Sequence, residues 1–198
     1  MNSSLFDLLK YKEFVHRLST KGKDGEDFFF DNSNIQHAEI VFSEFLDRTK
    51  KELFIVSDSF NEKFYENFLS NQLYSFLKQG KSLKIILLKG KINNFLKNLQ
   101  KEFGDKIDIK LFKSKDYGNI FEEISKELNK YLPNIRFNPK YLNFLLDDKY
   151  GFRIETHEDL ENNQTKAIVN FKHKDLHNLL YNTFNELAKL SYKATDNE

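Results

Sequence analysis

Segments with apolar residues at helical spacing alternate with short apolar runs along the first two thirds of the chain. The helical spacing covers residues 4–18, 33–46, 59–77, 91–103 and 118–131. The runs ELFIVSD, SLKIILLK and KIDIKLF lie between these segments and predict buried strands. Alternation of this kind builds a parallel sheet with helices on both faces.

The pattern changes in the last third of the chain. The strand-like runs NIRFN, YLNFLLDD, YGFRIE and KAIVNF follow one another with tight links, and Asp148-Lys149 predicts a turn between two of them. A final amphipathic helix is expected from about His173 to Leu190. The predicted fold class is α/β, with a mixed, mostly parallel sheet flanked by helices.

The stretch STKGKDGED is the most linker-like part of the chain. We therefore expect an N-terminal helical arm and linker at residues 1–32. One α/β domain should follow at 33–192, and a disordered tail at 193–198.

Composition narrows the function classes. With 21 Phe and no Trp, the core should be rich in phenylalanine. The 31 basic and 30 acidic residues give a net charge of +1, so nucleic acid is not indicated as a partner by net charge, although a local basic patch is compatible with it. The absence of cysteine excludes disulfides, cysteine-ligated zinc and cysteine nucleophiles. We expect a cytoplasmic protein with no membrane partner, because neither a signal peptide nor a membrane-length apolar stretch is evident. We also expect no cofactor.

Residues 141–188 carry a more specific pattern. An Asp147-Asp148-Lys149 turn precedes an Arg153-Ile154-Glu155 strand, Asn170-Phe171 ends the next apolar strand, and a helix closes on Phe184 to Leu187. This resembles the C-terminal half of bacterial phospholipase-D-like domains of the HKD superfamily. The upstream KELFIVSDSF and LKIILL segments resemble the first half, so the resemblance covers about residues 33–190. It implies the fold of one phospholipase-D-like half.

The resemblance fails at the catalytic motif. Active members carry His-x-Lys, in which the histidine attacks phosphorus to form a phospho-histidine and the lysine holds phosphate oxygens. Here the corresponding segment is Tyr141-Leu142-Asn143-Phe144, and no Gly-Ser pair follows. The resemblance thus implies a degenerate, non-catalytic module for binding or regulation. Because active relatives place two halves around one site, it also implies a homodimer or a partner protein, in bacterial antiviral defence or nucleic-acid processing.

Several polar residues are candidates for a ligand site. Asp58 ends the first predicted strand, where open sheets bind ligands, although Asp58 or Ser59 could instead cap the next helix. Arg153 and Glu155 share one face of a strand, either as an ion pair or as a phosphate-facing pocket. The predicted ligand-binding residues are Asp58, His37, Asn143, Asp148, Arg153, Glu155 and Asn170.

The histidines leave other functions open. His173 and His177 are spaced to chelate a metal, but a solvated helix start explains them as well, and we predict neither a metal site nor a catalytic residue. The rival hypothesis is a divergent phosphodiesterase or nuclease that uses His37, His157 or a metal at His173 and His177. A third is nucleic-acid binding without cleavage, since lysines recur among apolar residues from Lys78 to Lys115.

Overall fold

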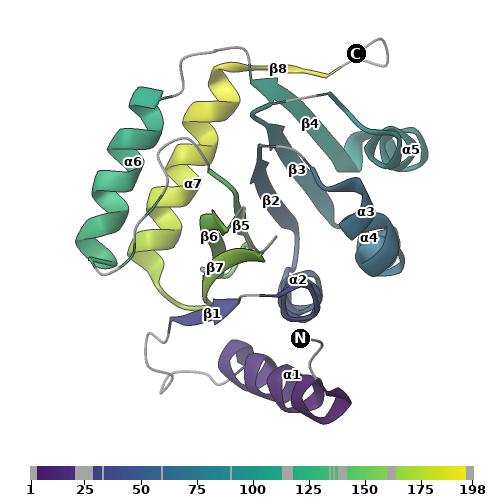
Figure 1. Cartoon of the computed structure of the whole chain (residues 1–198). Helices are drawn as coiled ribbons and strands as arrows, with labels where there is room; N and C mark the ends of the chain where they lie inside the picture. Colours follow the sequence, from purple (N-terminus) through teal and green to yellow (C-terminus); the bar gives the residue numbers. More distant parts are fainter. Residues whose placement is uncertain are drawn as a thin grey trace.

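A computed structural model describes residues 4–20, 29–32, 34–58, 60–89, 91–112, 118–133, 135, 137, 142–159 and 164–194. Within these residues, one mixed sheet carries helices on both faces (Figure 1). Its strands are β1 (Phe30–Asn32), β2 (Glu52–Ser57), β3 (Ser82–Leu87), β4 (Ile107–Phe112), β5 (Phe144–Leu146), β6 (Phe152–Asp159), β7 (Gln164–Asn170) and β8 (Ser191–Lys193). The helices are α1 (Leu5–Thr20), α2 (Ile35–Arg48), α3 (Glu62–Phe64), α4 (Ser70–Lys78), α5 (Asn94–Phe103), α6 (Gly118–Tyr131) and α7 (Lys174–Lys189), with a π-helix η1 (Tyr65–Leu69) and a 3-10 turn η2 (Gly104–Lys106).

The strand order in the sheet is β1-β7-β6-β5-β2-β3-β4-β8. Strands β2, β3 and β4 are parallel, as the helical crossovers between them predict. Among the described residues, however, five of the seven strand pairings are antiparallel, because β5, β6 and β7 follow one another through short links. The predicted α/β fold with a mixed sheet is confirmed, but the sheet is not mostly parallel.

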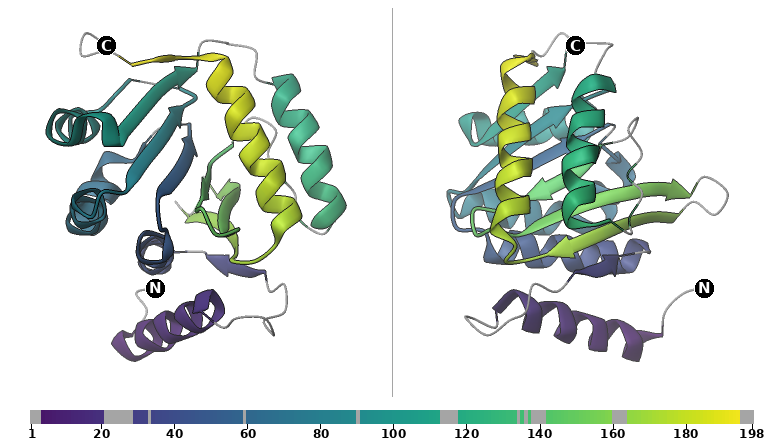
Figure 2. Two further views of the ribbon diagram at one scale, coloured as in Figure 1. Left: turned by 180° about the vertical axis from the view of Figure 1, so that it is seen from behind. Right: turned by 90° about the vertical axis from the view of Figure 1, so that its left-hand side faces the viewer.

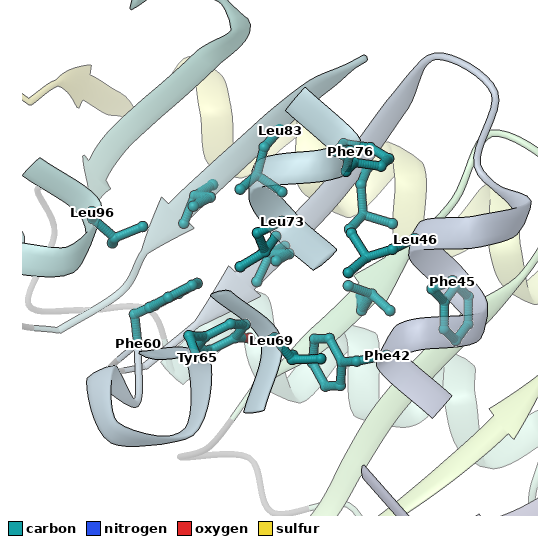
Figure 3. Close-up of a cluster of buried hydrophobic side chains, with 14 of the residues drawn as sticks. Phe42, Phe45, Leu46, Phe60, Tyr65, Leu69, Leu73, Phe76, Leu83 and Leu96 are labelled. Atoms are coloured by element: carbon teal, nitrogen blue, oxygen red, sulfur yellow. The ribbon is translucent and has the colours of Figure 1, made fainter. Parts of the chain in front are cut away.

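Two apolar cores lie on opposite faces of the sheet. Helices α2, α4 and α5 cover one face, and α6 and α7 cover the other (Figure 2). The first core is shown in Figure 3, where Phe42, Phe60 and Tyr65 lie near one another. The predicted phenylalanine-rich core is confirmed, since the largest fully buried side chains are Phe45, Phe76, Phe121, Phe144 and Phe152.

Asparagines cap the starts of α2 and α3. Asn34 Oδ1 accepts a hydrogen bond from the His37 N–H (2.8 Å), and Asn61 Oδ1 accepts one from the Phe64 N–H (3.1 Å). Ser59, the alternative cap named for the second of these helices, lies outside the described residues. Where we expected one helix over 59–77, the structure has α3, the π-helix η1 and α4 in succession. The wider π-helical turn lies near the ends of β2 and β3.

The last third of the chain forms the elements that its sequence predicts, with one exception. The turn at Asp148-Lys149 is present between β5 and β6. The run NIRFN is not the strand we expected where it is described, since Ile135 and Phe137 pack against the second core without joining a strand. Asn134, Arg136 and Asn138 lie outside the described residues.

The N-terminal helix packs on the domain. Val15 is fully buried in the first core, and β1 pairs with β7. The boundary expected after residue 32 stays a prediction, and of the expected tail only Lys193, at the end of β8, and Ala194 are described. The longest helices have 16 residues, and among the described residues none is long and apolar enough to cross a bilayer.

Candidate functional site

Two polar side chains meet where parallel strands β2 and β3 end. Asp58 directly follows β2, and Lys89 lies two residues beyond β3. Because carboxyl ends of parallel neighbours lie side by side, these residues are adjacent although they are far apart in sequence. Lys89 Nζ donates to Asp58 Oδ2 at 2.6 Å, and the Lys89 N–H donates to the Asp58 carbonyl at 2.9 Å.

Asn143 links this pair to the antiparallel half of the sheet. It precedes β5, which runs antiparallel to β2, so its side chain reaches the same end of the sheet. Asn143 Oδ1 accepts the Asp58 N–H at 2.6 Å, and its Nδ2 donates to Glu155 Oε2 at 2.7 Å. The Glu155 N–H also donates to the Asn143 carbonyl at 2.9 Å. Asn143 therefore bridges β2 and β6 through both ends of its amide.

Arg153 and Glu155 form a buried ion pair on β6. Arg153 NH1 lies 2.7 Å from Glu155 Oε1, and the side chains are only 5% and 15% exposed. The Arg153 guanidinium also lies over the Phe42 ring of α2, 5.3 Å from its centroid. A β-bulge follows between Glu155 and His157, an irregularity that is common beside functional sites. We call Asp58, Lys89, Asn143, Arg153 and Glu155 the polar cluster.

The polar cluster has two formal positive and two formal negative charges. Burial raises the pKa of Asp58; the hydrogen bond and charge of Lys89 oppose this, and the charge of Glu155 adds to it. Asp58 Oδ1 is buried and finds no donor among the described residues. Lys89, with 47% of its side chain exposed, is the charged member most open to solvent. The opposite charges of the cluster therefore largely compensate one another.

Tyr65 of the π-helix lies next to the polar cluster. Its ring stacks on Phe60 with centroids 3.6 Å apart (Figure 3). Burial raises the pKa of its hydroxyl, the charge of Glu155 raises it further, and Arg153 opposes the shift. Tyr65 therefore places a buried, uncharged phenol next to the cluster.

Asp148 and Asn170, which the sequence groups with Arg153 and Glu155, lie at the other end of the sheet. The Asp148 carboxylate accepts the N–H groups of Lys50 and Lys51 at 3.0 and 2.6 Å. Asn170 Oδ1 accepts two N–H groups of the turn into α7. The antiparallel register explains the separation, because Asn170 pairs with Phe152 whereas Glu155 pairs with Ala167.

A buried ion pair at that second end was not found from the sequence. Arg48 Nε lies 2.7 Å from Asp147 Oδ2, and the Asp147 side chain has no exposed surface. Burial lowers the pKa of Arg48, and the Asp147 charge opposes this. Asp147 Oδ1 also accepts the N–H groups of Lys149 and Gly151, which fixes the turn. The DDKYG turn is the one sequence signal that could have indicated Asp147.

The described histidine side chains serve local contacts. His37 stacks on Tyr11 of α1, with centroids 3.7 Å apart, and burial lowers its pKa. His173 caps α7, because its Nδ1 accepts the Leu176 N–H at 3.3 Å. His177 is buried, and its Nε2 donates to the Asp147 carbonyl at 2.7 Å. Within the described residues, no three carboxylate or imidazole groups gather as a metal site would require.

No protein-family model matches the chain. No curated protein matches it either. Solved structures do. TrmBL2, described as an archaeal chromatin protein with a novel mode of DNA binding, matches 96% of this chain at 19% identity and a TM-score of 0.56. Nuc from Salmonella typhimurium, a phospholipase D family member, matches 86% at 11% identity and a TM-score of 0.58. Phosphatidylserine synthase from Haemophilus influenzae Rd KW20 matches 89% at 11% identity and a TM-score of 0.56.

The matches differ in how much of the neighbour they span. This chain spans 64% of TrmBL2 and 44% of the synthase, but all of Nuc. Sequence identities this low establish the fold alone. The chain therefore has the phospholipase-D-like α/β fold that its sequence resembles.

Proposed function

We propose that this chain is a non-catalytic phospholipase-D-like module that acts by binding, as a homodimer or as a subunit of a nucleic-acid-processing or defence complex. Three observations support the proposal. The fold matches Nuc over its whole length. The segment 141–144 contains neither histidine nor lysine. The polar cluster lies at the end of the sheet where such folds bind ligands.

The main support for the proposal is the hydrogen bonding of the Asn143 side chain. Both ends of its amide are used, toward the Asp58 N–H and the Glu155 carboxylate. An amide cannot attack phosphorus as an imidazole does, and it brings no positive charge for a phosphate oxygen.

The charges of the cluster also disfavour phosphodiester cleavage. The buried cation, Arg153, is neutralised by Glu155. A phosphodiester anion would have to compete with Glu155 for Arg153 and approach the carboxylate of Asp58. Transition-state stabilisation at phosphorus needs preorganised positive charge, and a cluster with no net formal charge supplies little.

A phosphodiesterase assay tests this proposal. The full chain is incubated with DNA, RNA and an aryl phosphodiester, with and without Mg²⁺, Mn²⁺ or Zn²⁺. We expect no turnover above a matched Asn143→Ala preparation, which controls for contaminating nucleases. Turnover that a single His37→Ala or His157→Ala substitution abolishes would instead establish the divergent phosphodiesterase.

Nucleic-acid binding without cleavage is the second candidate. TrmBL2, whose description includes DNA binding, matches 96% of this chain, and this favours the candidate. Lys63, Lys89 and Lys91 also lie near the ends of β2 and β3, and Lys63 and Lys91 are exposed. Binding through these lysines should weaken steeply with salt, and Lys63→Ala with Lys91→Ala should lower the salt slope. A gel shift with duplex DNA checks this, with exposed Lys130→Ala as the control. No shift at low salt would dismiss the candidate.

A further inference from the structure

The turn between β5 and β6 carries an exposed tyrosine in a backbone conformation that tyrosine rarely adopts. Tyr150 has a φ of 71°, and among the described residues it is the one non-glycine residue with a positive φ. Turns normally place glycine or asparagine at such a position, because a Cβ there crowds the backbone. Here glycine comes one residue later, at Gly151, and Tyr150 is 43% exposed. Backbone strain of this kind clusters at sites that hold a ligand.

The Tyr150 ring is held in place on both sides of its own backbone. The buried carboxylate of Asp147 accepts the N–H groups of Lys149 and Gly151, both at 2.7 Å. The ring of Tyr150 meets the ring of His177 edge to face, with centroids 5.6 Å apart. A ring that is already ordered loses little conformational entropy when a partner stacks on it.

Three segments of the chain meet at this turn. Arg48 NH2 donates to the Lys149 carbonyl at 3.3 Å and to the Phe171 carbonyl at 3.2 Å. The end of α2, the β5–β6 turn and the segment leading into α7 are therefore neighbours. The lysines of these segments are Lys50, Lys51, Lys149, Lys172 and Lys174.

These segments together carry positive charge. Their formal charges are +2 for residues 47–51, −1 for 147–151 and +1 for 171–175. The polar cluster at the other end of the sheet has no net formal charge, so the turn is the better site for an anionic partner. The exposed acidic residues of the three segments are Asp47, Asp148 and Asp175.

A tyrosine ring among lysines fits a partner that carries both phosphates and unpaired bases. The Lys174 ammonium lies over the Tyr150 ring, 5.0 Å from its centroid. In proteins that bind single strands, bases stack on aromatic rings while nearby basic side chains contact the phosphates. An acidic peptide could pair with the lysines, but it would leave the strained conformation of Tyr150 without a role.

We infer that the β5–β6 turn binds single-stranded nucleic acid, with a base stacked on Tyr150 and phosphates held by Lys50, Lys51 and Lys174. This surface lies at the opposite end of the sheet from the polar cluster. The inference therefore goes beyond the proposed function and does not depend on it.

Fluorescence anisotropy of a labelled oligothymidylate with the full chain tests the phosphate contacts. Affinity should fall with salt, and Lys50→Ala with Lys51→Ala should lower the slope of log K against log salt by about 1.4, since each phosphate contact with a single strand contributes about 0.7. Both lysines are exposed, so the core stays intact. Lys12→Ala with Lys126→Ala removes two exposed lysines of α1 and α6 and should leave the slope unchanged.

Tyr150→Gly tests the stacking. Glycine accepts a positive φ, so the variant should remain folded by circular dichroism, while its dissociation constant for the strand rises about tenfold or more. Tyr150→Phe keeps the ring and should bind as the wild type does. An abasic strand of the same length tests the wild-type protein without any substitution, and it should bind about tenfold more weakly.

Three results would overturn the inference. The first is no change in anisotropy in low salt at protein concentrations up to about 100 μM. The second is an abasic strand, or a folded Tyr150→Gly variant, that binds as tightly as the unmodified pair. The third is polyglutamate that displaces the labelled strand as well as unlabelled oligothymidylate does, which would identify the surface as a site for acidic peptides.

Discussion

Replacing Glu155 with glutamine tests whether the polar cluster is a self-neutralised network. Glu155 accepts from Arg153 NH1 and from Asn143 Nδ2, both at 2.7 Å. Glu155→Gln keeps the size of the side chain but removes its charge and turns one acceptor into a donor. Arg153, only 5% exposed, then keeps its positive charge without the carboxylate beside it.

The size of the expected destabilisation follows from the burial of the Arg153–Glu155 pair. Breaking a buried ion pair by removing one partner costs about 3–5 kcal/mol. Glu155 retains 15% exposure, and glutamine still offers one oxygen, so we expect a loss of about 2–3 kcal/mol in the free energy of unfolding. For a chain of this length, that corresponds to a fall of about 5–10 °C in Tm. Urea denaturation and a thermal scan measure both quantities.

A surface carboxylate supplies the control. Glu127 pairs with Lys130 on α6, where both side chains are well exposed, so Glu127→Gln should cost about 0.5 kcal/mol or less. In a double-mutant cycle, Arg153→Met with Glu155→Gln should cost less than the two single changes together. If Glu155→Gln costs no more than the control, the charges of the cluster are not coupled and the reasoning fails.

Three further predictions concern the ends of the sheet. Because burial raises the pKa of Asp58, the folded state holds the Asp58 proton more tightly than the unfolded chain does. The resulting contribution to the free energy of unfolding is complete below about pH 4 and is lost as the pH rises through the folded pKa. Asp58→Asn should therefore make the free energy of unfolding, measured in urea titrations from about pH 3 to 7, less dependent on pH. Arg48→Met removes the cation beside buried Asp147 and should lower the free energy of unfolding by about 3–5 kcal/mol in the same assay; an unchanged value would contradict the contribution of this ion pair. Gly151→Ala would place a Cβ 2.7 Å from Asp147 Oδ2 and 2.9 Å from Phe45 Cε1, so differential scanning calorimetry should show a loss of about 1–3 kcal/mol, and full stability would contradict this packing.

Periodicity in the sequence predicted most of the elements. The apolar runs at 52–57, 82–87 and 107–112 became the parallel strands, and the helical spacing between them became the crossovers. The π-helix η1 was not foreseen, because it shares the apolar spacing of the α-helices around it.

The site was predictable only in part. Asp58, Asn143, Arg153 and Glu155 were named, and the structure brings them together. Lys89 was missed because its partner is fixed by the parallel register of β2 and β3, which no local pattern encodes. The end of the sheet that each residue reaches also depends on strand pairing, which is why Asp148 and Asn170 were grouped with the wrong neighbours.

Intact-mass spectrometry after incubation with an aryl phosphodiester tests the central claim most directly. The proposed non-catalytic role requires that no histidine of this chain attacks phosphorus and holds a phosphoryl group. We predict that the mass of the protein remains that of the unmodified chain at every time point. A phosphoryl adduct that disappears when one histidine is replaced by alanine would contradict the account.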